Sequence, residues 1–350
     1  MDGTDKKYYD LNKLSQLLDL DHLKPEIYMV CGNRTAGKTF AVKNKMIKDF
    51  KKKKWKFCVI KRLLDDIGNV SEEYFKDLEQ VKYRGETLTE KMVSSTFSKL
   101  FLNREHCGYV VALNGAERIR NRSAIFSDVM QMHFDEFQSE NGCYVQNEIS
   151  KFQSIHTSIA RGKGEQSRYV PVYMTSNMVT ILNPYYEAFG IGPRLKENTK
   201  FLRGHGWVFE NTFNKNAADA LASSGFGRAF GDSKYMKYAQ ENVYLNDNMS
   251  LIGKPEGVSS YVCTIIWQNN YYAIYEYQNG VLYCSDVADK TFPVTFTLLT
   301  TDHNENTILV KSDPFVIESF RKMFSYGLFR FKNLKCKEVI LHLLSYDNLK

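Results

Sequence analysis

The chain has 350 residues, of which 43% are hydrophobic and 25% charged, and its net charge is +7. This length allows one large domain or two ordinary ones, and the composition is that of a folded protein. Seven scattered cysteines without CxxC spacing suggest neither a disulfide framework nor a zinc site. No uncharged stretch suits a membrane helix, so we expect a non-membrane protein of a reducing cytoplasm.

The first 211 residues are predicted to form an α/β domain. An apolar run at 26–31 predicts a buried strand, which is followed by a glycine-rich turn and a helix at 39–50. The later predicted elements are a strand at 55–62, a hairpin at 95–113, a strand at 129–134, a helix at 147–161 and a strand at 169–177. Parallel strands place the polar residues at their carboxyl ends on one rim of the sheet, where α/β folds bind ligands.

The rest of the chain changes in character. Residues 212–245 are small and polar with several glycines, so they predict a linker or a small connecting domain. Residues 246–350 predict a smaller α+β domain, with a hairpin that turns at Asn279-Gly280 and two final helices at 314–324 and 336–346.

The strongest motif is a complete GxxxxGK[ST] match, formed by Gly32, Asn33, Arg34, Thr35, Ala36, Gly37, Lys38 and Thr39. In such a loop the backbone N–H groups face the phosphates, the lysine neutralises them and the threonine hydroxyl holds Mg²⁺. The motif lies between an apolar run and a helix, where its chemistry requires it to be. The sequence therefore predicts ATP and Mg²⁺ as ligands.

A pair of carboxylates follows the predicted strand at 129–134. Asp135 is placed to hold Mg²⁺, and Glu136 to polarise the attacking water as a general base. Asn177, at the end of the next strand, could contact both the γ-phosphate and that water, or could simply end the strand. Because phosphate-transferring kinases and most GTPases lack the second carboxylate, the pair indicates an ATP hydrolase.

Two arginines are candidates for a finger that stabilises the transition state. Arg161 closes the predicted helix after the acidic pair, and Arg122 precedes Asp135 by thirteen residues. A finger stabilises the charge that spreads over the γ-phosphoryl oxygens. Each arginine could equally be a solvated surface charge, and the sequence leaves the choice open.

Near the end of the chain, residues 311–337 combine basic and aromatic side chains. Such a mixture suits a nucleic-acid surface, although the aromatic residues could equally form a core. The candidate nucleic-acid-binding residues are Lys311, Arg321, Lys322, Arg330, Lys332, Lys335 and Lys337.

Specific segments resemble the DNA-packaging (encapsidation) ATPases of the phi-29-like small tailed bacteriophages. The segments that carry the resemblance are GNRTAGKT at 32–39, FDEF at 134–137, SN…NPYYEAF at 176–189, TLLTTDHNEN at 297–306 and SYGLFRFKN at 325–333. They span nearly the whole chain, and the last two are specific to the family rather than to P-loop proteins in general.

The resemblance implies a ring motor of the additional-strand P-loop class (RecA/FtsK/HerA-like) that assembles as a homopentamer. It implies double-stranded viral DNA, the portal of the procapsid and a structural packaging RNA as partners, in the cytoplasm of the infected host and transiently at the portal vertex. It also implies that Arg161 acts in trans, that Arg122 matches a second trans-acting position that is lysine in a relative, and that 246–350 is an RNase H-like, vestigial nuclease domain.

Two other functions use the same motifs. A cellular or plasmid-type DNA translocase or helicase has the same ATPase core, but the resemblance of the C-terminal segments disfavours it. A scaffold that binds ATP without hydrolysing it has no need of a water-activating carboxylate, so Glu136 argues against that function.

Overall fold

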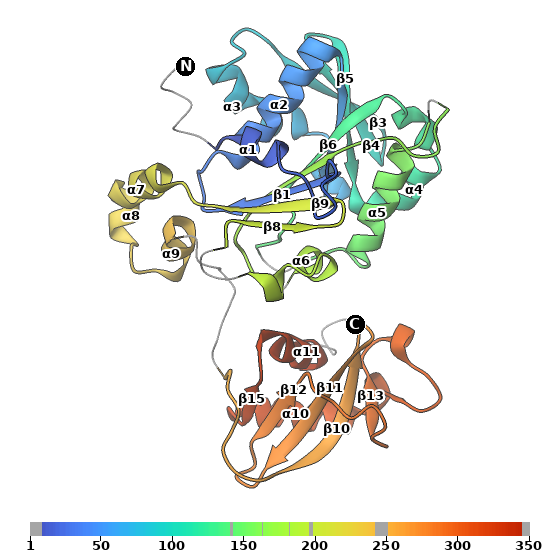
Figure 1. Ribbon diagram of the computed structural model, residues 1–350, viewed down its shortest axis with the longest axis vertical. Helices are drawn as coiled ribbons and strands as arrows, with labels where there is room; N and C mark the ends of the chain where they lie inside the picture. The colour runs from blue at the N-terminus through green and yellow to red at the C-terminus, as the bar shows by residue number, and fades with distance from the viewer. Residues whose placement is uncertain are drawn as a thin grey trace. The chain divides into compact units, whose positions relative to one another are not determined.

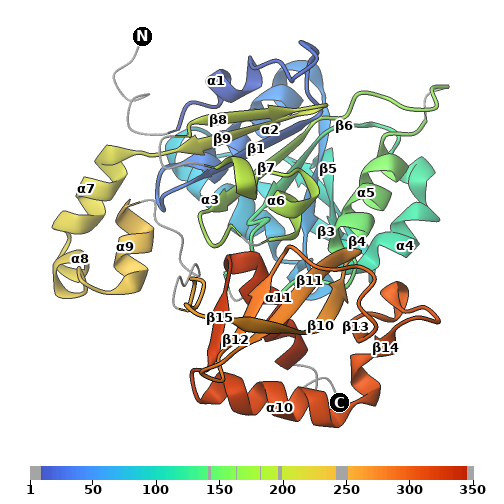
Figure 2. The ribbon, with the colours of Figure 1, turned by 60° about the horizontal axis from the view of Figure 1, so that its bottom comes forward.

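The structure, a computed structural model, describes residues 9–140, 143–162, 164–181, 183–195, 199–241 and 251–344. The chain divides into two compact units, Met1–Asn246 and Asp247–Lys350, each with a sheet of its own (Figures 1 and 2). Within the described residues, no helix is both long and apolar enough to cross a membrane.

The first unit is built on a nine-stranded sheet with the order β3-β4-β5-β2-β6-β7-β1-β9-β8 in the part of the chain that is described. The strands from β5 to β9 in this order are parallel, and the antiparallel strands β3, β4 and β8 extend the two edges. Their bounds are β1 Ile27–Gly32, β2 Lys56–Lys61, β3 Leu88–Ser94, β4 Phe97–Leu102, β5 Glu105–Ala112, β6 Val129–Asp135, β7 Val172–Asn177, β8 Phe201–Gly204 and β9 Trp207–Thr212.

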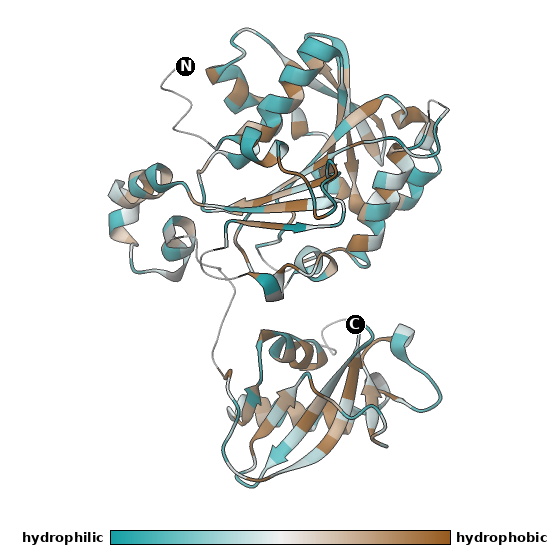
Figure 3. Cartoon of the chain, in the orientation of Figure 1, coloured by the Kyte–Doolittle hydropathy of each residue, from teal (hydrophilic) through white to brown (hydrophobic). Residues whose placement is uncertain are grey.

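Helices cover both faces of this sheet. On β1, Tyr28 and Val30 pack toward one group of helices, while Met29 and Cys31 pack toward the other, as the period of two along a strand requires. Figure 3 shows hydrophobic residues along the central strands and hydrophilic ones on the outer sides of helices such as α2. The first group is α1 Leu11–Ser15, α2 Lys38–Lys53 and α3 Val70–Val81, and the second is α4 Ala116–Arg120, α5 Glu148–Ile159 and α6 Pro184–Ala188.

The position of β7 decides the class of the fold. β7 pairs in parallel with β1 on one side, where Gly32 is opposite Asn177, and with β6 on the other, where Asp135 is opposite Thr175. One strand is therefore inserted between the strand that leads into the glycine-rich turn and the strand that ends in the acidic pair. This arrangement confirms the predicted additional-strand P-loop fold.

The segment predicted as a linker or small connecting domain is helical where it is described. It contains α7 Lys215–Ser223, α8 Gly225–Ala229 and α9 Lys234–Glu241, which belong to the first compact unit. Asn214 and Ser224 cap α7 and α8 with their side-chain oxygens, so the small polar residues that suggested a linker act partly as helix caps. Residues 242–245 lie outside the described part.

The second unit has a six-stranded sheet in its described residues, with the order β14-β13-β10-β11-β12-β15. β10, β11 and β12 form an antiparallel meander, β13 adds in parallel beside β10, and β15 adds in parallel beside β12. The helices α10 and α11 pack on it through residues such as Phe320 and Ile340. The bounds are β10 Ser259–Trp267, β11 Asn270–Tyr277, β12 Leu282–Ser285, β13 Thr295–Thr297, β14 Ile308–Leu309, β15 Phe329–Phe331, α10 Pro314–Ser325 and α11 Leu334–Leu344.

Candidate nucleotide-binding site

The turn between β1 and α2 requires glycine at two positions, Gly32 and Gly37, for different structural reasons. Gly37 precedes α2 with a φ of 87°, in the left-handed region that glycine adopts at no steric cost. At Gly32 the cause is space, because a Cβ atom there would lie 2.3 Å from the carbonyl oxygen of Thr212 on β9. The first glycine of the motif therefore serves the packing of the sheet, and the second serves the conformation of the turn that leads into α2.

A cavity of about 310 Å³ lies at the carboxyl edge of the first sheet, against the start of α2. It brings together most of the residues that the sequence predicted, from the glycine-rich turn and from the ends of β6 and β7. Its lining residues are Arg34, Thr35, Ala36, Gly37, Lys38, Thr39, Phe40, Asp77, Asp135, Glu136, Ser176 and Asn177. Asp77 comes from α3, and no motif in the sequence could have identified it.

Lys38 is a buried cation that suits a phosphate group. Its side chain is 5% exposed, and its Nζ donates to the carbonyl oxygens of Gly32 at 3.1 Å and Asn33 at 2.7 Å and to Oδ1 of Asn177 at 3.3 Å. These acceptors are neutral, and burial lowers the pKa of Lys38 to about 8. None of these three hydrogen-bond acceptors carries a negative charge, and a polyphosphate bound in the cavity would supply one to the ammonium group of Lys38.

Thr39 and Asp135 form an oxygen-rich pair suited to Mg²⁺. The Thr39 hydroxyl donates to Oδ1 of Asp135 at 2.8 Å, and the Thr175 hydroxyl donates to the same oxygen. Burial opposes ionisation of Asp135, but the neighbouring His133 and these two hydroxyl groups lower its pKa below the ordinary value. An ionised carboxylate beside a hydroxyl is the kind of ligand set that Mg²⁺ prefers, so the residues present fit this ion.

Glu136 follows Asp135 but has a different environment. Its side chain is exposed at the cavity, and its backbone has a φ of 53°. Partial burial and the adjacent charge of Asp135 raise the pKa of Glu136. The pKa values of the two carboxyl groups are thus shifted in opposite directions, that of Asp135 toward the ionised form and that of Glu136 toward accepting a proton.

Two residues of the glycine-rich turn make contacts that the sequence did not predict. The Asn33 side chain is buried, donates to the carbonyl of Asn214 at 3.0 Å and accepts its N–H at 2.9 Å, so it supports the turn and does not line the cavity. The prediction that Asn33 belongs to the ATP-binding turn therefore concerns its main chain, and it stays a prediction. Arg34 pairs with Glu140, which also accepts from the hydroxyl of Tyr238 on α9 at 3.0 Å.

The two candidate finger arginines lie outside the cavity. Arg122 and Arg161 are both exposed, on the side of the sheet covered by α4 and α5. Their segments touch, because a Cβ atom on Gly162 would lie 3.0 Å from Cβ of Ser127. The buried Arg168 donates to the carbonyl of Ile159 at 2.7 Å, which fixes the end of α5 just before Arg161.

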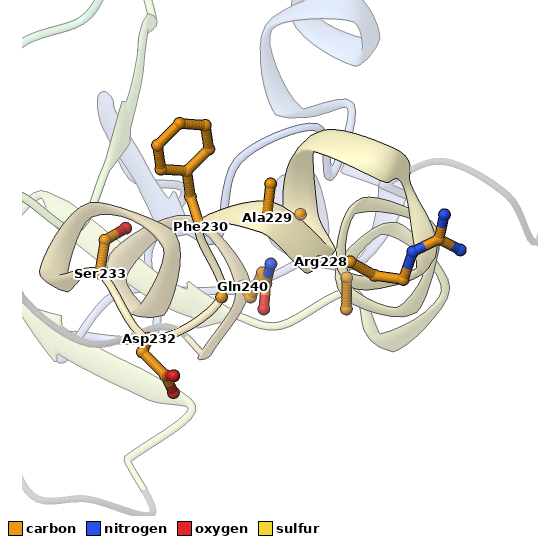
Figure 4. Close-up of a pocket in the computed structure, with 9 residues that line it drawn as sticks. Arg228, Ala229, Phe230, Asp232, Ser233 and Gln240 are labelled. Carbon is orange, nitrogen blue, oxygen red and sulfur yellow. The ribbon is translucent and has the colours of Figure 1, made fainter.

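A second cavity, of about 520 Å³, lies among α7, α8 and α9. Figure 4 shows the side chains of Arg228, Asp232 and Gln240 pointing in different directions rather than toward a common point. A ligand site needs a few convergent polar groups, so this cavity offers less than the one at the glycine-rich turn.

The predicted basic and aromatic surface of the second unit is partly structural. Phe320, Phe329 and Phe331 are buried in the core, which settles the question that the sequence left open for these three. Among the basic residues, Arg321 donates to the carbonyl of Leu344, Arg330 to that of Phe329, Lys332 pairs with Asp286, and Lys337 is 9% exposed. Lys322 is exposed and Lys335 half-buried, while the side chain of Lys311 lies outside the described residues.

The carboxylates of the second unit do not converge. Asp286 accepts from Lys332 and from Asn333, Asp289 accepts from Thr291, and Asp313 caps α10. In the described ranges, no group of three or more His, Cys, Asp or Glu residues could hold a metal ion. Nucleases of the RNase H type need several carboxylates on two metal ions, so the described part of this sheet lacks that machinery.

Comparison with protein families and curated proteins gives consistent matches. The model of the podovirus DNA encapsidation protein (Gp16) family matches residues 5–348. The DNA packaging protein of Bacillus phage phi29 is 24% identical over 319 residues, covering 90% of this chain and 92% of that protein. The DNA packaging protein of Bacillus phage B103 is 25% identical over 309 residues, covering 87% and 92%.

Solved structures of similar fold come from the same kind of protein. A chain of the bacteriophage phi-29 viral genome packaging motor assembly superposes with a TM-score of 0.65 and 21% identity, covering 96% of this chain and 99% of that one. The phi-28 gp11 DNA packaging motor gives a TM-score of 0.61 with 15% identity, covering 99% and 98%. These superpositions show that the fold is shared along nearly the whole length.

Proposed function

This chain belongs to the podovirus DNA encapsidation protein family, and from that premise we propose that it hydrolyses ATP to drive double-stranded viral DNA into a procapsid. The observation that carries the proposal is the insertion of β7 between β1 and β6. This insertion brings Asn177, at the end of β7, to Lys38. Asp135 and Glu136 lie beside them, at the end of the neighbouring strand β6. A phosphate-binding cation, a metal ligand and a second carboxylate thus surround one cavity.

Each of these residues has a separate task in hydrolysis. Lys38 and the N–H groups of the turn bind the phosphates, and Thr39 and Asp135 hold Mg²⁺, which supplies positive charge to the β- and γ-phosphates when bound. Glu136 takes the proton of the attacking water, because its raised pKa suits a base that must accept and release protons. The Asn177 amide orients this water against the γ-phosphate.

We further propose that the protein works as a homo-oligomeric ring, a pentamer, docked on the portal of the procapsid together with a structural packaging RNA. The positions of Arg122 and Arg161 support the proposal of a ring. Both side chains are exposed, on segments that touch each other outside the cavity, and we propose that they reach a neighbouring subunit from there. In the second unit, the exposed Lys322 and Lys332 are proposed to contact nucleic acid. The site of action is the cytoplasm of the infected host, transiently at the portal vertex.

Phosphate release from the purified full chain tests the proposal, measured with and without duplex DNA and with procapsids. A packaging motor should release phosphate faster when DNA is present, and should protect DNA from added nuclease only when procapsids and ATP are both supplied. A scaffold that binds ATP without hydrolysing it would release no phosphate under any of these conditions. A translocase of another system would respond to DNA but not require procapsids.

A further inference from the structure

A buried ion pair lies directly behind the loop that carries Glu136. Arg62 follows β2, and Glu148 begins α5, with the Arg62 Nε at 3.2 Å from both carboxylate oxygens of Glu148. The Glu148 side chain is 1% exposed and that of Arg62 16%. The hydroxyl of Tyr185 donates to Glu148 Oε1 at 2.8 Å, and the N–H of Val145 donates to Oε2 at 2.9 Å. The carboxylate is therefore fixed from three directions.

The two Nη atoms of the same guanidinium group hydrogen-bond the main chain at Glu136 and Phe137. Its Nη2 donates to the carbonyl oxygen of Phe137 at 2.8 Å, and both Nη atoms donate to that of Glu136 at 3.3 Å. With a φ of 53°, Glu136 has a left-handed backbone that residues with a side chain rarely adopt. Such a conformation persists only where the surroundings determine it, and the contacts from Arg62 hold the carbonyl of Glu136 itself and that of the next residue, Phe137.

We propose that Arg62 is a positioning residue for hydrolysis, which holds the Glu136 backbone so that its carboxylate faces the attacking water. The inference rests on the proposed function, with Glu136 as the base. Arg62 is suited to this task because its planar group can grip Glu148 with one edge and two carbonyls with the other. It does not line the cavity, so its loss should slow catalysis and leave nucleotide binding unchanged.

The test must separate positioning from the cost of an unpaired buried charge. Arg62→Met alone would leave the buried carboxyl group of Glu148 without its cation, which destabilises a fold. The double variant Arg62→Met/Glu148→Gln removes both charges, and the amide can still accept from Val145 and donate to the Tyr185 hydroxyl. Arg84→Met is the matched control, because Arg84 is exposed and donates only to the carbonyl of Gln80 among the hydrogen bonds described for it.

In the full-length protein, we expect the double variant to unfold at a temperature close to that of the wild type. Its kcat should fall by about a hundredfold, the scale of a 1 Å misplacement of a catalytic group, while KM and the affinity for a fluorescent ATP analogue change by less than about twofold. Arg84→Met should match the wild type in each measurement. An unchanged kcat in the folded double variant would overturn the inference, and so would a loss confined to KM.

A second measurement shows whether Arg62 acts through Glu136. In single-turnover hydrolysis with labelled ATP, adding the Arg62→Met/Glu148→Gln changes to Glu136→Gln should slow the reaction by less than about threefold more, because the group to be positioned is already gone. A full further hundredfold loss would show that Arg62 acts elsewhere and would overturn the inference. A wild-type protein that binds ATP but does not hydrolyse it would instead contradict the proposed function itself.

Discussion

In the first unit, side chains from the ends of neighbouring parallel strands line one cavity, whereas in the second unit polar side chains at comparable positions contact one another. Asp135 and Asn177 end β6 and β7 at the same edge of the sheet, while Asp286, just after β12, is held by Lys332 and Asn333. The direction of the strands does not explain the difference, because β12 and β15 are also parallel neighbours and bring Asp286 and Lys332 to one edge of their sheet. There the two residues have opposite charges and pair with each other, whereas Asp135 and Asn177 border a cavity, so we expect the chemistry in the first unit.

The largest expected effect comes from the buried cation of the first unit. Lys38→Ala should reduce ATP hydrolysis by roughly three orders of magnitude or more, the scale of removing a cation from the transferred phosphoryl group. The fold should persist, because a buried charge without a carboxylate in its hydrogen bonds adds little stability. Phosphate release measures the loss, and Arg84→Met, at an exposed residue outside the cavity, serves as the control with normal turnover. Near-normal hydrolysis in Lys38→Ala would place the chemistry somewhere else.

Arg161→Ala tests whether the first unit is complete without a neighbour. We expect a loss of roughly 10³-fold in the assembled ring, because a finger acts on the γ-phosphate of the adjacent subunit. Mixing Arg161→Ala with Glu136→Gln subunits should restore partial activity at interfaces where an intact Arg161 meets an intact Glu136. If the mixtures stay as inactive as either parent, Arg161 is no trans finger, and Arg122→Ala should be mixed in the same way.

Glu136→Gln separates binding from hydrolysis inside the cavity. The amide keeps the shape of the side chain but cannot take a proton, so single-turnover hydrolysis should slow by about 10²-fold or more while ATP affinity is retained. Affinity for labelled ATP and the hydrolysis rate should be measured on the same preparation. Loss of affinity together with the rate would show that Glu136 holds the metal, and would remove the contrast with Asp135.

The sequence predicted the parts of the first unit that depend on local patterns. The glycine-rich turn, the apolar strands at 27–32 and 129–135 and the acidic pair are each signalled by neighbouring residues, and the structure brings them together. The strands β3, β8 and β9 were missed. β3 and β8 are the two edge strands, and their exposed and mixed side chains give a weak period of two, so pairing with a neighbouring strand decides their structure.

Contacts between distant segments could not be predicted in the same way. Arg62 and Glu148 are 86 positions apart, and nothing in the residues around either one signals their buried pair. Asn33 meets Asn214 across the strand pair of β1 and β9, so a residue inside a known motif acquires a structural role. For the aromatic residues at 320–331, composition fits a stacking surface and a core equally well, and only the sheet they pack on decides.

The smallest expected effect lies in the second unit, where the proposed contact with nucleic acid depends on exposed charge. Lys322 lies in the last turn of α10 and is exposed, whereas Lys337 on α11 is largely buried. If Lys322 neutralises one phosphate of duplex DNA, Lys322→Ala should make the slope of log affinity against log salt shallower by about 0.9. Lys337→Ala should leave this slope unchanged and lower the unfolding temperature, because it removes a packed aliphatic stem.

Fluorescence anisotropy of labelled duplex DNA at several salt concentrations, with the full-length protein, measures both slopes. Equal slopes in the wild type and Lys322→Ala would exclude Lys322 from the contact with phosphate. If Lys337→Ala changes the slope and Lys322→Ala does not, the second unit contacts DNA through a surface that includes α11 and not through the exposed side of α10.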